Sequence, residues 1–115
     1  MKKILIVDDN ESLRESIKIS LKKYQYDIDT ACDGEAAMSM VINGEYDTII
    51  TDVYMPGTNG VEMAQKIYQN QPNIKFIIMT AHEFPVFSEP FEKIQKPFSS
   101  INLVNLIEND SLGGI

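Results

Sequence analysis

The sequence predicts an α/β fold in which a doubly wound parallel sheet carries helices on both of its faces. Along most of the 115 residues, apolar runs of strand length alternate with stretches of helical periodicity. That alternation is typical of βα units joined by right-handed crossovers. Within the segments 3–7 and 74–80, residues 4–7 and 76–79 are apolar without interruption, as expected of strands that are buried on both faces. At this length the chain is expected to form one domain.

Composition narrows the possible functions. The chain has 10 Lys and Arg against 17 Asp and Glu, a net charge of −7, which argues against binding to nucleic acid because such proteins need a basic surface. The lone Cys32 excludes an internal disulfide and is expected to be a small buried side chain. No apolar run approaches the roughly 20 residues of a membrane span, and the N-terminus does not resemble a signal peptide. We therefore expect a cytoplasmic protein that does not enter a membrane.

Five strands and four helices follow from the pattern of apolar residues. Strands are expected at 3–7, 27–31, 47–51, 74–80 and 91–95, and helices at 10–24, 33–45, 60–70 and 99–109. Each helix has an apolar stripe at helical spacing: Leu13, Ile17, Leu21 and Tyr24; Ala37, Met40 and Val41; Val61, Ala64, Ile67 and Tyr68; and Leu103, Leu106 and Ile107. Asn10 is a candidate N-cap of the first helix, and Gly44 a candidate C-cap of the second.

The alternation breaks after Thr80. Residues 81–90 read AHEFPVFSEP, and their two prolines leave no room for a regular helix of more than about a turn or two. Only fifteen residues separate Thr80 from Lys96, and the fifth strand takes about five of them. The connection of roughly ten residues that remains is short even for a crossover between parallel strands.

Polar residues stand at the ends of four of the predicted strands. Asp8 and Asp9 follow the first strand, Asp52 ends the third, Thr80 ends the fourth, and Lys96 follows the fifth. In open α/β sheets the ligand site lies at the carboxyl ends of the strands. We therefore expect three carboxylates, a hydroxyl and an ammonium group to share one rim of the sheet.

These groups have a common chemical logic. Carboxylates about 5 Å apart repel one another by about 3 kcal/mol per pair at an effective dielectric constant near 20. Mg²⁺ relieves this repulsion, because it prefers oxygen ligands and leaves room for waters and a phosphate oxygen. A carboxylate can attack phosphorus and carry the phosphoryl group as an acyl phosphate. A metal ion, a lysine and a hydroxyl would neutralise the charge on the transferred group.

Four segments, ILIVDDNES, TDVYMPGTNG, IIMTA and QKPF, resemble the signature segments of the bacterial response-regulator receiver domain. The resemblance extends from about Lys3 to Ile107. It implies a flavodoxin-like sheet with strand order 2-1-3-4-5. We expect a receiver domain at residues 1–109, followed by a flexible C-terminal tail at 110–115.

The resemblance also implies a role for each site residue. Asp52 would be the phosphoacceptor, and Mg²⁺ would bind to Asp8, Asp9, Asp52 and the backbone carbonyl of Tyr54. Thr80 would bind a phosphoryl oxygen and change position, Lys96 would form an ion pair with the phosphoryl group, and Pro97 would follow a cis peptide bond. His82, two residues after Thr80, is a candidate modulator of the lifetime of the phosphoryl group.

The chain departs from the family pattern in two places. The family has a full helix between the fourth and fifth strands, which we expect here to be truncated or replaced by a loop. The family also has a switch aromatic three residues before the lysine, where this chain has Lys93; Phe91 could take that role if the register has shifted. Phe84, Phe87 and Phe91 either fold back over the core or form an exposed apolar patch that binds a partner.

The sequence thus predicts a regulatory domain rather than an enzyme. It would accept a phosphoryl group from a sensor histidine kinase or a phosphotransfer protein and signal to a downstream protein target by contact. One alternative is a receiver-like docking module that phosphorylation no longer switches. Another is an aspartate-nucleophile phosphatase, although Tyr54 stands where such enzymes have a second aspartate.

Overall fold

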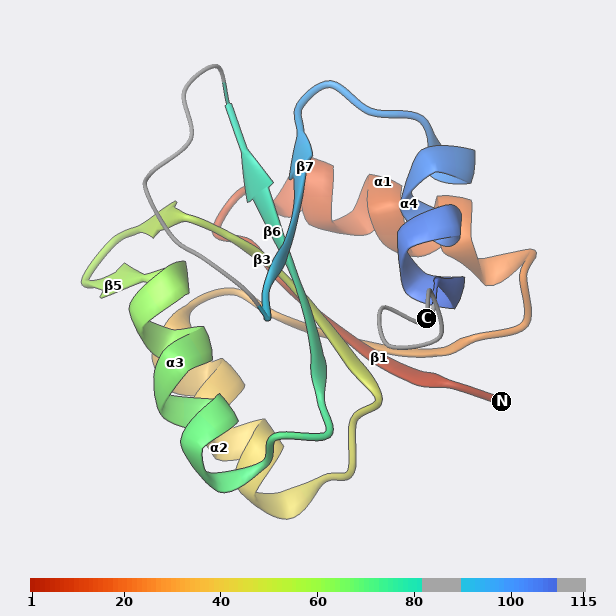
Figure 1. The fold of residues 1–115 in the computed structure, drawn as a ribbon. Coiled ribbons are helices and arrows are strands. Elements are labelled where there is room, and N and C mark those ends of the chain that lie inside the picture. The colour runs from red at the N-terminus through yellow and green to blue at the C-terminus, as the bar shows by residue number, and fades with distance from the viewer. Residues whose placement is uncertain (82–89, 110–115) are drawn as a thin grey trace.

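The computed structural model describes residues 1–81 and 90–109 and has a five-stranded parallel sheet at its centre (Figure 1). The strand order is β2-β1-β3-β6-β7, and all four pairings are parallel. The strands are β1 (Lys3–Val7), β2 (Asp27–Ala31), β3 (Thr48–Asp52), β6 (Lys75–Thr80) and β7 (Glu92–Gln95). Counted within this sheet alone, the order is 2-1-3-4-5, so the predicted topology is confirmed.

Two helices cover each face of the sheet, as Figure 1 shows. The helices are α1 (Glu11–Lys22), α2 (Gly34–Asn43), α3 (Gly60–Asn70) and α4 (Ser100–Glu108). α1 and α4 pack on one face, and α2 and α3 pack on the other. All four have a side-chain N-cap, and the first is Asn10, whose amide oxygen accepts a hydrogen bond from the backbone N–H of Leu13. These caps satisfy donors that a helix leaves unpaired at its first turn.

The central strands are buried because both faces of the sheet are covered. In β1, Leu5 and Val7 belong to the core beneath α2 and α3, whereas Ile4 and Ile6 belong to the core beneath α1 and α4. All four side chains are fully buried. Successive side chains of a strand point to opposite faces, so a strand between two cores must be apolar at every position. This requirement explains the uninterrupted apolar runs in the sequence.

A small β-hairpin follows β3, and the sequence did not predict it. β4 (Tyr54–Met55) pairs antiparallel with β5 (Thr58–Asn59), and Gly57 in the turn has φ +74°. Such a backbone conformation favours glycine. At the far end, the N–H of Gly60 donates to the carbonyl of Val53 at 2.6 Å. A Cβ at Gly60 would lie 1.9 Å from the backbone oxygen of Asp52, so only glycine allows this close approach.

The connection between β6 and β7 is short, as predicted. It spans the eleven residues 81–91, of which 82–89 lie outside the described part of the chain. For comparison, the helices α1, α2 and α3 in the other crossovers alone have 12, 10 and 11 residues. The predictions for His82, Phe84, Phe87 and the tail at 110–115 also fall outside the described residues.

The sequence predicts that the fifth strand begins at Phe91. In the structure β7 begins at Glu92, and Phe91 lies just before it. Its ring is buried and packs edge-on against Phe76 and Tyr68, at centroid distances of 5.3 and 6.0 Å. For Phe91, the expectation that the aromatic side chain folds back over the core is therefore confirmed. Lys93, at the position of the family's switch aromatic, lies within β7 and is exposed.

Two details of burial differ from the sequence-based expectations. Cys32 is exposed rather than buried, because it follows the last residue of the edge strand β2 and precedes the N-cap of α2. On α4, Val104 is buried with Leu103 and Ile107, whereas Leu106 is only half-buried. Within the described ranges, no helix combines the length and apolar character needed to cross a membrane.

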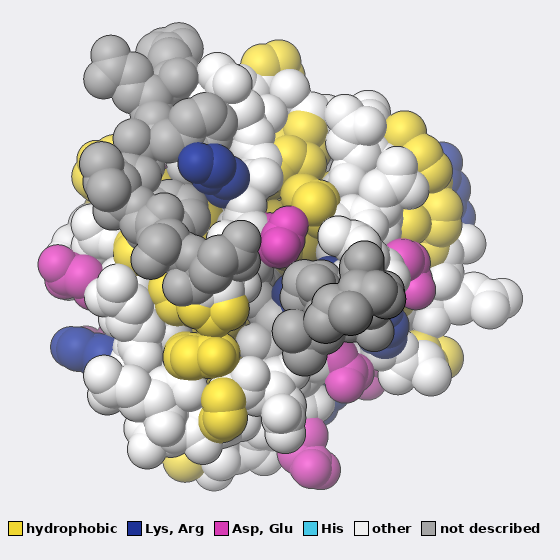
Figure 2. All heavy atoms as spheres, in the orientation of Figure 1, with side chains coloured by type: hydrophobic (Ala, Val, Ile, Leu, Met, Phe, Trp, Pro, Cys, Tyr) yellow, Lys and Arg dark blue, Asp and Glu magenta, His cyan; other side chains and the backbone are white. Residues whose placement is uncertain are grey.

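Charge on the surface is mixed. On the face drawn in Figure 2, the Lys and Arg side chains of the described residues are scattered among acidic and apolar ones and form no continuous basic patch. The net charge of −7 agrees with this distribution. The described residues on this face therefore do not form the kind of basic stripe that proteins use to bind a phosphate backbone.

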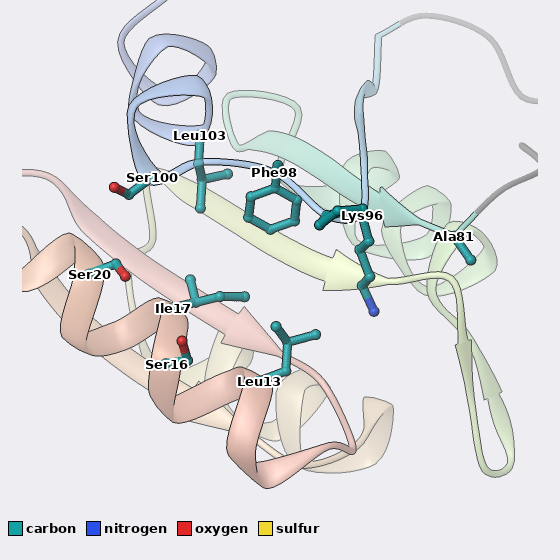
Figure 3. Close-up of a pocket in the computed structure, with 10 residues that line it drawn as sticks. Leu13, Ser16, Ile17, Ser20, Ala81, Lys96, Phe98, Ser100 and Leu103 are labelled. Atoms are coloured by element: carbon teal, nitrogen blue, oxygen red, sulfur yellow. The ribbon is translucent and has the colours of Figure 1, made fainter.

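A mostly apolar cavity of about 420 Å³ lies between α1 and α4 (Figure 3). Leu13 and Ile17 of α1 line one wall, and Phe98 and Leu103 line the opposite one. At the carboxyl end of the sheet the cavity reaches Lys96. It therefore adjoins the rim where the sequence predicts the functional site.

Candidate functional site

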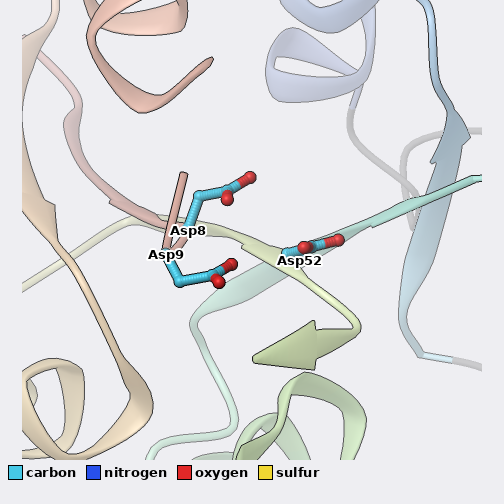
Figure 4. Close-up of side chains that lie close together, drawn as sticks. All are labelled: Asp8, Asp9 and Asp52. Carbon is cyan, nitrogen blue, oxygen red and sulfur yellow. The ribbon is translucent and has the colours of Figure 1, made fainter. Parts of the chain in front are cut away.

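Three carboxylates meet at the carboxyl end of the sheet (Figure 4). Asp8 and Asp9 follow β1 directly, and Asp52 is the last residue of the neighbouring strand β3. One carboxylate oxygen from each of the three lies within 4.8 Å of the others. The structure therefore brings together the three acidic residues that the sequence singled out, because parallel pairing aligns the ends of β1 and β3.

Asp8 is the most buried of the three, with 1% of its surface exposed. Its Oδ1 accepts a hydrogen bond from the backbone N–H of Asn10 at 2.9 Å, whereas its buried Oδ2 has no hydrogen-bond partner in the described structure. Burial raises the pKa of Asp8 above its usual range, and the charges of Asp52 and Asp9 add to this rise. The Asn10 hydrogen bond and the Lys96 charge act in the opposite direction.

Lys96 supplies the positive charge of the site. It follows β7, and its ammonium group lies 3.2 Å from Oδ1 of Asp52 and 3.7 Å from Oδ2 of Asp8. Its backbone N–H donates to the carbonyl of Thr80 at 2.7 Å. The peptide bond between Lys96 and Pro97 is cis, the geometry that the family resemblance implies. The lysine is therefore directed into the acidic cluster and is not a solvated surface residue.

The two oxygens of Asp52 have different surroundings. Oδ1 accepts hydrogen bonds from the backbone N–H of Val53 at 3.0 Å and from the Lys96 ammonium at 3.2 Å. No donor to Oδ2 is found among the described residues. The side chain is 19% exposed, so a molecule in solution can reach it.

Thr80 lies at the same rim but turns its hydroxyl group toward β7. Its side chain is buried, and Oγ1 lies 3.5 Å from the carbonyl oxygen of Ile94, at the upper limit of hydrogen bonding. Tyr54, two residues after Asp52, has an exposed side chain. In this structure the Thr80 hydroxyl is thus directed toward the edge strand β7 and not into the acidic cluster.

The donor set fits a hard divalent cation. Asp8, Asp9 and Asp52 offer three carboxylate oxygens within reach of one ion, and Oδ2 of Asp8 is a buried oxygen that lacks a hydrogen bond. Burying an unsatisfied carboxylate oxygen costs free energy unless a cation or a donor compensates it. Oxygen ligands of this kind suit Mg²⁺. Lys96 alone, at 3.7 Å from that oxygen, provides only part of the compensation.

Sequence reasoning missed one residue that touches the site. Nη1 of Arg14 donates to the backbone carbonyl of Asp8 at 2.8 Å. A signal for this contact does exist in the sequence: Arg14 stands one turn after the N-cap Asn10, and side chains of a helix point back toward its N-terminus. Only the three-dimensional path of the turn at residues 8–10 shows that the guanidinium group reaches this carbonyl.

Comparison with known proteins agrees with this site. The response regulator receiver domain family matches residues 4–108. The response regulator ArlR of Staphylococcus saprophyticus is 35% identical over 94 residues, which are 82% of this chain and 40% of that protein. The alkaline phosphatase synthesis transcriptional regulatory protein PhoP of Bacillus subtilis is 33% identical over 93 residues, which are 81% of this chain and 37% of that protein.

Solved structures show the same fold. The response regulator TrrA of Thermotoga maritima, solved in complex with Mg(2+)-BeF, has a TM-score of 0.82 and 33% identity, with 94% of this chain and 97% of that chain covered. The chemotaxis protein CheY4 of Vibrio cholerae has a TM-score of 0.81 and 25% identity, with 94% and 97% covered.

The alignment covers most of this chain but less than half of the curated relatives named above, about 40% of their length. Functions of those longer proteins that depend on their other regions therefore do not transfer from the alignment. The family match, in contrast, spans nearly all of the fold described above, including the acidic cluster and Lys96. This chain belongs to the response regulator receiver domain family.

Proposed function

We propose that this receiver domain accepts a phosphoryl group on Asp52 from a sensor histidine kinase or a phosphotransfer protein, and signals by contact with a downstream protein. Receiver domains are regulatory signalling domains of two-component systems rather than conventional enzymes. The observation that carries the proposal is the position of Asp52 between the Lys96 ammonium and the carboxylates of Asp8 and Asp9. A phosphoryl group on Asp52 would have cationic and metal-binding groups on either side.

The two oxygens of Asp52 suggest which one reacts. Oδ1 already accepts two hydrogen bonds, from Val53 and Lys96, whereas Oδ2 is the oxygen available for attack. Oδ2 would form a bond to phosphorus while the bond from phosphorus to the donor breaks, and the electron pair leaves with the donor. The product is an acyl phosphate. Hydrolysis, in which water attacks phosphorus, returns the free carboxylate and inorganic phosphate.

Asp8, Asp9, Asp52 and the backbone carbonyl of Tyr54 would bind Mg²⁺. The ion supplies positive charge beside the transferred phosphoryl oxygens when it is bound. Asp8 contributes a buried oxygen that the fold holds in place without a hydrogen bond, so little reorganisation is needed for it to become a ligand. Preorganised groups of this kind are what phosphoryl transfer requires of a protein.

Thr80 and Lys96 would respond to the phosphoryl group. The Lys96 ammonium is already within 3.2 Å of Asp52 and needs only a small shift to pair with a phosphoryl oxygen. The Thr80 hydroxyl must rotate away from the carbonyl of Ile94, and the contact it loses is long and weak. Because Ile94 belongs to β7, this rotation would change the contact between the site and the edge strand.

The output of the switch is proposed to be a protein contact in the cytoplasm, without nucleic acid or membrane. The negative net charge and the scattered basic residues of Figure 2 support this. One longer relative, NtrC of Azospirillum brasilense, is called a DNA-binding transcriptional regulator, but the aligned part is 23% of it. Lys93 at the position of the switch aromatic supports an output that differs from the family's usual coupling of threonine and aromatic.

Intact-mass spectrometry tests the proposal. The protein is incubated with a small phosphodonor such as acetyl phosphate, with and without Mg²⁺, and compared with Asp52→Asn. A single phosphoryl adduct that requires Mg²⁺ and is absent from Asp52→Asn is the expected result. No adduct at short quench times, even with a kinase as donor, would favour a docking module that phosphorylation does not switch. Steady turnover of a phosphate monoester would favour the phosphatase alternative.

A further inference from the structure

Arg14 contacts the backbone at the acidic pair without touching a carboxylate. Its Nη1 donates to the carbonyl oxygen of Asp8 at 2.8 Å, in a partly buried position. The backbone N–H of Arg14 donates to the carbonyl of Asn10 at 3.0 Å, so the side chain starts from the regular first turn of α1. Within the described residues, Arg14 forms no ion pair with an acidic side chain.

The other polar atoms of Asp8 are also bonded, with one exception. Its backbone N–H donates to the carbonyl of Ala31 at the end of β2, at 3.2 Å, and its Oδ1 accepts from the N–H of Asn10 at 2.9 Å. With Arg14 on the carbonyl, three of the four polar atoms of Asp8 are fixed by three different segments. The remaining atom, Oδ2, is buried and lacks a hydrogen bond. The direction in which Oδ2 points is therefore set by the contacts to the N–H, the carbonyl and Oδ1 of Asp8.

We propose that Arg14 is a positioning residue for the metal site. By fixing the carbonyl of Asp8, it fixes the peptide plane that joins Asp8 to Asp9, and so aims both carboxylates toward Asp52. The inference rests on the proposed function, because it assumes that these carboxylates bind Mg²⁺. Residues that orient metal ligands from outside the ligand shell commonly set the affinity of the site.

The charge of Arg14 and its proposed positioning role would change Mg²⁺ affinity in opposite directions, which makes the proposal testable. A guanidinium group near a cation site repels the cation, so its removal would by charge alone strengthen Mg²⁺ binding. If Arg14 acts by positioning Asp8, its removal instead weakens Mg²⁺ binding. The direction of the change in Mg²⁺ affinity therefore distinguishes the positioning role from the electrostatic one.

The experiment is a calorimetric titration of Mg²⁺ into wild type, Arg14→Met and Lys18→Met. Arg14→Met keeps an apolar stem and removes the guanidinium group, and we expect its Kd for Mg²⁺ to rise about tenfold. Lys18 lies one turn further along α1, so Lys18→Met removes the same charge and leaves the Asp8 contact in place. Its Kd should stay close to that of wild type. If the methionine variant does not fold, Arg14→Ala also removes the guanidinium group and introduces a good helix former, and the same rise is expected with it.

Phosphorylation by a small phosphodonor gives a second readout. We expect Arg14→Met to need more Mg²⁺ for half-maximal rate and to approach the wild-type rate at saturating Mg²⁺, since Arg14 contacts no reacting group. A general loss of structure would lower the rate at every Mg²⁺ concentration. Wild type that binds no Mg²⁺ would overturn the proposed function itself. Wild-type binding with equal or tighter binding by Arg14→Met, or a saturating rate that stays low, would overturn the role of Arg14 alone.

Discussion

The Lys96 ammonium lies 3.2 Å from Oδ1 of Asp52, although the two residues come from strands that are not neighbours in the sheet. Lys96 follows β7, Asp52 ends β3, and β6 lies between these strands. The lysine side chain thus crosses the end of β6, beside Thr80, to reach the acidic cluster. Through this reach, the proposed phosphorylation of Asp52 would have a direct route to the edge strand.

Replacing Lys96 by methionine should slow phosphorylation of Asp52. The variant keeps an apolar stem but removes the ammonium group that would neutralise charge on the transferred phosphoryl group, and electrostatic contacts of this kind are worth about a hundredfold or more in rate. Rates are measured by intact mass at saturating Mg²⁺. Lys93→Met, which removes one positive charge from an exposed position of β7, the strand that precedes Lys96, serves as the control. Equal rates for wild type and Lys96→Met would contradict a role for this ion pair.

Replacing Asp8 by asparagine should stabilise the metal-free protein. Burial and the neighbouring carboxylates disfavour the charge of Asp8, as its raised pKa indicates, so removing that charge relieves a cost of about 1 to 2 kcal/mol. For a domain of this size, that corresponds to a rise in Tm of roughly 5 °C or more. Thermal unfolding with and without Mg²⁺ tests this.

The same variant should lose the stabilisation by Mg²⁺ that we expect of wild type, because ligand binding stabilises the folded state in proportion to occupancy. A metal-free Asp8→Asn protein that melts below wild type would show that the carboxylate has a structural role of its own. An undiminished Mg²⁺ shift would show that Asp8 is not a metal ligand.

Replacing Gly60 by alanine should disturb the site by displacing the backbone at Asp52. The added Cβ would lie 1.9 Å from the carbonyl oxygen of Asp52, so the β3 end or the start of α3 must move, at a cost of roughly 2 kcal/mol or more. Gly57→Ala is a matched control, because its Cβ would meet no atom within 4 Å and only its φ of +74° is unfavourable. Urea unfolding and the phosphorylation rate should both be affected more by Gly60→Ala. A larger effect of Gly57→Ala than of Gly60→Ala would contradict the close approach of Gly60 to the Asp52 carbonyl.

Glu108 should make stability depend on pH in the acid range. Its carboxylate accepts a hydrogen bond from the Tyr26 hydroxyl at 2.5 Å, and this bond, assisted by Lys2, lowers the pKa of Glu108. A lowered pKa means that the stabilisation is present above the unfolded-state pKa near 4.5 and is lost as the pH falls through the folded-state value. The side chain is 53% exposed, so the effect should stay below about 1 kcal/mol.

Urea midpoints of wild type and Glu108→Gln between about pH 3 and 7 measure this dependence. The difference between them should shrink as the pH falls below 4.5. Glu35→Gln, which removes an exposed carboxylate from α2, controls for net charge. A difference that stays constant across the range would mean that the Tyr26 contact is not coupled to the charge.

Sequence patterns could predict much of this protein because several signals agree. The strand ends at Asp8, Asp52 and Thr80 follow from apolar runs, and the parallel sheet then brings those ends together. The short connection before β7 follows from residue counts alone. These features depend on local residue patterns and on topology, both of which can be predicted from the order of apolar and polar segments in the sequence.

Other features depend on contacts that no local pattern records. The β4–β5 hairpin spans only six residues and has no apolar alternation to mark it. The bond from Arg14 to the Asp8 carbonyl and the orientation of Thr80 toward Ile94 depend on the path of the backbone between elements. Cys32 was expected inside because cysteine is usually buried, and its place at the end of an edge strand overrides that preference.

The proposed function requires that Asp52, and not Asp8 or Asp9, carries the phosphoryl group. Borohydride reduction of the phosphorylated protein converts an acyl phosphate to an alcohol, so an aspartyl phosphate becomes homoserine, which peptide mass spectrometry can locate. We expect homoserine at position 52 alone, only after treatment with phosphodonor and Mg²⁺. Homoserine at position 8 or 9, or its absence from a protein with a stable phosphoryl adduct, would contradict it.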